Sequence, residues 1–224
     1  MTLQRNPTRS MLTISLFASA PLLLASGASG NLIVNGSFEN PAFAGSHITY
    51  FSPTTAITGW TVSGPGTVVI VKAPDAGFAT GNSTFNFAHH GDYYLDLSGN
   101  GQPHATISQT VTTVFGQAYE LSFWIGASNQ NAPAATIGVR LDGIGTFVNA
   151  ALTPSAPLTN INWTRYAYTF IADSTSTTLR FRGLSTFDDN TSFVDGCMIE
   201  EVPAPASALL LLGGAAGYRR RRLQ

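Results

Sequence analysis

Apolar and polar residues alternate with a period of two in several short runs of this chain. Between positions 119 and 125 every odd residue is apolar, and Glu, Ser and Trp occupy the even positions. The same alternation recurs over 137–142 and 178–182. Short alternating runs are typical of half-buried strands, and the middle of the chain has no run with a helical period. The pattern therefore predicts an all-β fold, an antiparallel β-sandwich with turns between its strands.

Both ends of the chain depart from this pattern. At the N-terminus, Arg5 and Arg9 precede the apolar run 11–24, and small residues fill 25–30. A charged start, an apolar stretch and a small-residue zone are typical of a cleaved secretory signal peptide. Residues 1–30 are therefore predicted to form a signal helix that is removed on export, with the mature chain beginning near Asn31.

The C-terminus combines three parts: a Pro-rich motif, an apolar stretch over 206–218, and a cluster of arginines. This order is a membrane stop signal whose positive end stays in the cytoplasm. A helix over 204–218 would measure only about 22 Å, against a hydrocarbon core of about 30 Å. The segment is therefore predicted to be a short apolar helix that inserts transiently, although a retained tail anchor is the alternative. The residues of the motif and the cluster are Val202, Pro203, Ala204, Pro205, Arg219, Arg220, Arg221 and Arg222.

This tail, residues 202–224, resembles the PEP-CTERM sorting tail that exosortase-type membrane proteases process in Gram-negative bacteria. The usual Val-Pro-Glu-Pro motif reads Val-Pro-Ala-Pro here. The resemblance implies an exosortase-type protease as a partner, and a final location at the cell surface or outside the cell.

Removing both ends changes the charge balance. Residues 31–201 hold five basic and twelve acidic residues, a net charge of −7, whereas the full chain carries −1. An acidic domain argues against nucleic acid or anionic lipid as a partner and is compatible with neutral sugars or divalent cations. Cys197 is the single cysteine, so no intrachain disulfide can form. We expect it to be a small buried residue of a terminal strand.

The region 31–201 also carries a series of short landmarks in a characteristic order. The series resembles the choice-of-anchor C family of exported bacterial proteins. That family is similar in turn to carbohydrate-binding jelly rolls of the galactose-binding-like superfamily, and to a plant cell-wall domain of uncertain function. The resemblance implies an eight- or nine-stranded antiparallel jelly roll with a secreted, polysaccharide-associated role. The landmarks are residues 31–39, 58–60, 94–99, 107–110, 116–119, Trp163 and 193–196.

The resemblance also implies a structural calcium ion that joins the first strand to the last. Glu39 and Asp195 match the two carboxylate positions, although the usual Asp-Asn pair reads Asp195-Gly196 here. Calcium prefers carboxylate and carbonyl oxygens, which two adjoining termini can supply. The alternative is that both are loop carboxylates hydrogen-bonded to backbone amides. His89 and His90 are a weaker candidate metal pair, because neighbouring side chains of an extended chain diverge.

Trp124 lies out of phase with the apolar face of its run, so it is predicted to point away from the core. An outward aromatic ring among polar neighbours can stack on the apolar side of a sugar ring. Three arginines also occupy outward phases and could bind sugar hydroxyls or uronate carboxylates: Arg140, Arg180 and Arg182. The alternative for Trp124 is cover by a loop or by a second core layer. Trp60 and Trp163 are expected in the core, as the family resemblance implies.

No motif of a hydrolase, metalloprotease or phosphate-binding loop occurs in the chain. Asp92 and Asp96 would lie about 13 Å apart on one strand face, beyond the about 5–9.5 Å that glycoside hydrolysis requires. We therefore predict a non-catalytic carbohydrate-binding protein of the cell surface or matrix. A structural matrix or adhesion protein without sugar affinity and an enzyme of undetected type remain the alternatives.

Overall fold

The structure, a computed structural model, consists of strands, turns and loops. Within the part of the chain that it describes, no helix is long and apolar enough to span a bilayer. The predicted signal helix lies outside the described residues, as does nearly all of the predicted sorting tail. The described residues are 30–76, 85–99, 105–127, 136–142, 147–151, 161–184 and 192–203.

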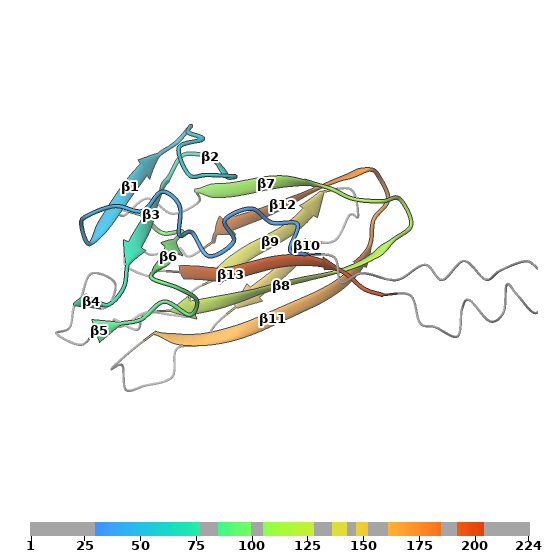
Figure 1. Ribbon diagram of the computed structural model, residues 1–224. Helices are drawn as coiled ribbons and strands as arrows, with labels where there is room; N and C mark the ends of the chain where they lie inside the picture. Colours follow the sequence, from blue (N-terminus) through green and yellow to red (C-terminus); the bar gives the residue numbers. More distant parts are fainter. Residues whose placement is uncertain are drawn as a thin grey trace, which may run out of the picture.

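Two antiparallel sheets pack face to face, with a short hairpin at one end (Figure 1). The six-stranded sheet has the order β1 (His47–Phe51), β3 (Thr67–Lys72), β6 (Tyr93–Asp96), β13 (Ser192–Glu201), β8 (Ala118–Ala127) and β11 (Asn162–Ile171). The five-stranded sheet has the order β10 (Phe147–Ala151), β9 (Thr136–Asp142), β12 (Ser176–Gly183), β7 (Thr106–Thr112) and β2 (Thr61–Ser63). The hairpin pairs β4 (Asp75–Ala76) with β5 (Phe85–Asn86).

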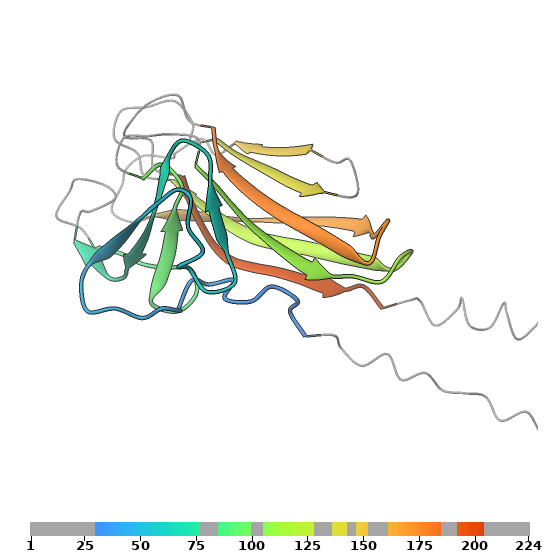
Figure 2. The same cartoon turned by 90° about the horizontal axis from the view of Figure 1, so that it is seen from above.

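The predicted antiparallel jelly-roll sandwich is confirmed, and Figure 2 shows the two layers from above. The expected number of strands is too low, because the described residues alone form thirteen. Several of the additional strands have only two or three residues, too few for a period of two to be recognised.

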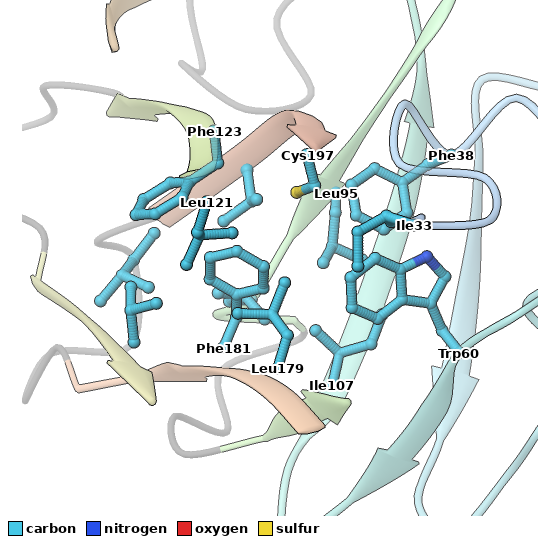
Figure 3. Packing of buried hydrophobic residues seen from close by; sticks show 14 of the residues in the cluster. Ile33, Phe38, Trp60, Leu95, Ile107, Leu121, Phe123, Leu179, Phe181 and Cys197 are labelled. Carbon is cyan, nitrogen blue, oxygen red and sulfur yellow. The ribbon is translucent and has the colours of Figure 1, made fainter. Parts of the chain in front are cut away.

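The main core fills the space between the sheets. The predicted inward face of β8 is confirmed, since Tyr119, Leu121, Phe123 and Ile125 are all at most 1% exposed. Figure 3 shows Phe123 of β8 and Phe181 of β12 close together, and their ring centroids are 5.0 Å apart with the planes nearly perpendicular. Such edge-to-face contacts add specific geometry to the burial of apolar area.

Trp60 and Cys197 both lie in this core, as expected, and each is 1% exposed. Trp163 does not. It is half-buried on the opposite face of β11, where it packs against a second, smaller cluster that includes Tyr94 and Phe193. Its indole Nε1 donates to the Phe87 carbonyl at 3.0 Å. The six-stranded sheet therefore carries a second apolar layer on part of its outer face.

The first described residues run beside β13 and close the sandwich. The Leu32 amide donates to the Ile199 carbonyl at 2.9 Å, and the Cys197 amide donates to the Gly36 carbonyl at 3.0 Å. On the other sheet, the Gln109 side chain accepts from the Val34 amide at 2.7 Å and donates to its carbonyl at 2.9 Å. The segment thus occupies the edge of β13 beyond its short pairing with β6 and ties the two sheets together.

Candidate functional site

Three of the predicted sugar-binding residues meet on the outer face of the five-stranded sheet. Arg140 of β9 is directly opposite Arg180 of β12, and Arg182 lies two residues further along β12. The inward neighbours Val139, Leu141, Leu179 and Phe181 belong to the core, so the alternation of each strand forces the arginines outward. We call the outer surface formed by Arg140, Asp142, Arg180 and Arg182 the arginine face.

Asp142 joins two of these arginines. Its two carboxylate oxygens lie 2.5 Å from Arg140 Nε and 2.5 Å from Arg180 Nε. The arginine side chains are 51% and 43% exposed, and the aspartate side chain is 28% exposed. Among the described residues, Arg182 forms no ion pair. One carboxylate thus serves two guanidinium groups, and the site keeps an excess of positive charge.

A hollow of about 660 Å³ opens at the arginine face. Across the strands, Arg182 is opposite Gly138 on one side and Thr106 on the other. Because Gly138 has no side chain, the surface is recessed beside Arg182. The described lining contains polar groups, charges and backbone, and no aromatic ring: Ser63, Gly64, Pro65, Thr106, Gly138, Arg140, Asp142, Arg180, Arg182 and Leu184.

Trp124 lies on the other sheet, on its outer face, and does not join the arginine face. Its indole stacks on the His89 imidazole, with ring centroids 3.6 Å apart and planes 19° from parallel. This is the loop cover that the sequence left open as an alternative, and it covers one face of the half-buried ring. Burial lowers the pKa of His89, with a smaller effect from His90. Sugar binding by Trp124 stays a prediction.

Glu39 and Asp195 hold the same loop from two sides. Glu39 Oε1 accepts from the backbone amides of Asp92 at 2.9 Å and Tyr93 at 3.0 Å. Asp195 is fully buried, and its Oδ2 accepts from the His90 amide at 2.8 Å. The first segment and the last long strand are therefore linked here, as the family resemblance implied.

The arrangement fits a calcium ion in part. Burial raises the pKa of Asp195 to about 8, backbone hydrogen bonds from His90 and Gly196 oppose the rise, and the charge of Glu39 adds to it. A buried carboxylate beside another one favours a cation. Within the described ranges, however, no group of three His, Cys, Asp or Glu residues converges as a metal site. Further ligands would have to be backbone carbonyls, and calcium at Glu39 and Asp195 stays a prediction.

Comparison with known proteins identifies the family. Residues 31–202 match the family described as "Protein of unknown function (DUF642)". The chain belongs to this family.

Among curated proteins, this DUF642 chain is similar to halomucin of Haloquadratum walsbyi, with 29% identity over 198 residues. The match covers 83% of this chain and only 2% of the relative's length.

Two solved structures illustrate the fold. TmCBM61, solved with β-1,4-galactotriose, gives a TM-score of 0.51 at 20% identity, covering 78% of this chain and all of that one. The CBM22-1 xylan-binding domain of Paenibacillus barcinonensis Xyn10C gives 0.44 at 18% identity, covering 80% and 100%. The first likeness shows that the DUF642 domain has the fold of a carbohydrate-binding jelly roll.

The sequence reasoning missed two functional candidates of the DUF642 domain, Asp142 and Gly138. Both occupy the same outward phase as Arg140 in β9, so the alternation itself could have identified them. The candidate catalytic pair is also clarified. Asp96 is 1% exposed beneath the surface, while Asp92 is exposed in the loop before β6. The described structure therefore offers no pair of exposed carboxylates at these two positions. Asp188 and Asp189 lie outside the described residues.

Proposed function

We propose that this protein is an exported, non-catalytic, carbohydrate-binding protein of the cell surface or extracellular matrix, and that the arginine face is its binding site. The observation that carries the proposal is the hollow at this face, which combines exposed guanidinium groups with hydroxyl and backbone groups. Guanidinium groups offer several hydrogen-bond donors in a fixed geometry, and sugars present many acceptors. The likeness to a module solved with a galactotriose supports a sugar as the ligand.

A binding assay with the full chain and a panel of soluble polysaccharides tests the site. We expect Gly138→Leu, which fills the recess beside Arg182, to weaken binding at least about tenfold, because about 1.4 kcal/mol corresponds to that factor. Ser63→Phe, placed at the rim of the hollow, should act in the same direction. Trp124→Ala is the matched control on the other sheet. Thermal melting of each variant separates lost binding from lost folding.

Two results would contradict the proposal. If the full chain binds no polysaccharide in the panel, the carbohydrate function is wrong. If Trp124→Ala removes binding while Gly138→Leu and Ser63→Phe do not, the function stands and the site belongs on the six-stranded sheet.

Export and tail processing belong to the same proposal. The signal-like residues 1–30 and the sorting-like residues 202–224 support cleavage at both ends, the second by an exosortase-type protease after transient insertion in the inner membrane. Intact-mass measurement of extracellular protein should give a mass lacking both segments. Recovery of the full-length chain as a stable inner-membrane protein would contradict the processing.

A specific observation favours one alternative, a structural matrix protein. Val114, Phe115 and Ile171 are 61%, 72% and 63% exposed, and hydrogen bonds between 116–117 and Ala172 hold their two loops together. An exposed apolar patch of this kind can mediate association. Self-association that Phe115→Ser abolishes, without binding of any sugar, would favour this alternative.

A further inference from the structure

We infer that the ligand of the arginine face is an acidic polysaccharide, whose uronate carboxylate binds Arg182 and Arg180 in the hollow. This inference rests on the proposed function and names its substrate class. It is argued from the distribution of charge, from the contacts of Asp142, and from the lining of the hollow.

The charges of the domain are segregated between its two sheets. In the described strands of the five-stranded sheet, the charged residues are three arginines and Asp142, a local charge of +2. Most acidic residues outside this sheet lie on or beside the six-stranded one. They include Glu39, Asp92, Asp96, Glu120, Asp195, Glu200 and Glu201. At physiological ionic strength charges beyond about 8 Å are largely screened, so the local +2 decides what approaches this face.

The placement of the arginines does not serve the stability of the sheet. Arg140 and Arg180 are directly opposite in the antiparallel register, where like charges are destabilising. Asp142 offsets this repulsion for these two, and both of its oxygens are engaged in doing so. Arg182 brings a third positive charge to the same face and gains nothing from this bridge. A ligand with a negative charge would complete the balance.

Asp142 also demonstrates the chemistry. Its contact with Arg180 Nε at 2.5 Å uses one of the five N–H donors of that guanidinium group. A guanidinium fork matches a carboxylate in two-point geometry, and such charge-assisted pairs are roughly twice as strong as neutral hydrogen bonds. The recess left by Gly138 adjoins Arg182, so a ligand carboxylate can reach this side chain within the hollow.

The lining argues against a neutral sugar as the preferred ligand. Stacking on an aromatic ring is how a protein gains affinity for the apolar face of a pyranose, and the described lining of the hollow holds no such ring. The remaining source of affinity is polar and charged. A polysaccharide that carries carboxylates uses this source fully, whereas a neutral chain uses only its hydroxyl groups.

The test compares soluble oligogalacturonate with its fully methyl-esterified form, using the full chain and calorimetric titration. The two ligands share a backbone and differ in the charge of the carboxyl group. We expect the acid to bind at least tenfold more tightly, and Arg182→Gln to remove this preference. Arg182→Lys should keep part of it, because lysine retains the charge and loses the fork. Arg165→Gln, which removes an arginine paired with Glu120 on the six-stranded sheet, is the matched control.

The outcomes separate the inference from the proposed function. Equal binding of acid and ester, unaffected by Arg182→Gln, would overturn the uronate inference and leave carbohydrate binding intact. Binding of neither ligand, together with no binding to any other polysaccharide, would overturn both. Equally tight binding of poly-glutamate would mean that charge alone is recognised, which also overturns the inference. Loss of affinity for the acid in Arg182→Gln but not in Arg165→Gln supports it.

Discussion

Asp96 is the residue whose burial has the clearest consequence for stability. It lies in β6 at 1% exposure, and its Oδ1 accepts from the Ser98 amide at 2.8 Å. Burial raises the pKa of Asp96 to about 7, although hydrogen bonds from Ser98 and Gly99 act in the opposite direction. The folded state therefore holds a proton on Asp96 at pH values where the unfolded chain has released it.

The sign of the pH effect follows from this difference. Below the unfolded pKa, near 4, the contribution to stability is fully present, and it is lost as pH rises towards 7. We expect Asp96→Asn to flatten this part of the stability profile, and to make the protein more stable than the wild type at pH 8 by a few kcal/mol at most. Denaturant unfolding at pH 5 and pH 8 measures it. An unchanged pH dependence in the variant would contradict the assignment.

At the level of single residues, alternation predicted direction well and partnership poorly. It placed Arg140, Arg180 and Arg182 on outward phases, and the structure agrees. It could not show that Arg140 and Arg180 face each other, because register depends on pairing between strands far apart in sequence. For the same reason Trp124 and the arginines, although all outward, lie on different sheets.

At the level of elements, β13 shows how one inserted residue redirects a strand. Its pairing with β8 shifts between Asp195 and Met198, where Gly196 has a φ of +57°. Glycine tolerates this conformation, which is typical of a bulge that adds one residue to a strand. As a result Val194 and Cys197, three positions apart, both enter the main core. A strict period of two could not have predicted this change.

The first described segment depends on Gln109 of β7. The Gln109 side chain is 7% exposed and pairs with both backbone groups of Val34. We expect Gln109→Leu to lower the free energy of unfolding by about 1–3 kcal/mol, because two buried backbone groups lose their partner. Amide hydrogen exchange at Val34 should accelerate as the segment opens. Thr112→Ala, at an exposed position of the same strand, is the control, and equal effects of both changes would contradict the role of Gln109.

Strand length explains which elements the sequence revealed. The ten residues of β8 and the eight of β12 contain enough alternation to be recognised. In contrast, β3 is buried on both faces and has no alternation, and β2 has three residues. The second apolar layer on the six-stranded sheet also escaped prediction, since its members come from separate strands and loops.

For the whole molecule, the meeting of the first segment, the 89–93 loop and β13 makes a cation a global matter. Calcium bound by Glu39 and Asp195 would neutralise a buried carboxylate and join elements from both ends of the domain. Binding to the folded state alone raises stability in proportion to the logarithm of ligand concentration. We expect 1 mM calcium to raise the melting temperature by several degrees relative to chelator, since a few kcal/mol shifts the midpoint by that much.

Glu39→Gln should remove the calcium effect, because it takes away one of the two anionic ligands. Glu120→Gln, which changes an exposed carboxylate on β8, is the control and should keep it. Identical melting of the wild type in calcium and in chelator would show that both carboxylates serve only the backbone amides of the loop.

The adjoining ends of the folded region have one more consequence. Leu32 and Ile199 are hydrogen-bonded neighbours, so the chain enters and leaves the sandwich at almost the same place. A module of this kind can be spliced into a surface loop of a host protein, or strung along a very long polypeptide, without stretching or rearranging its scaffold. Matching a stretch that is 2% of a giant relative is what such portability would produce.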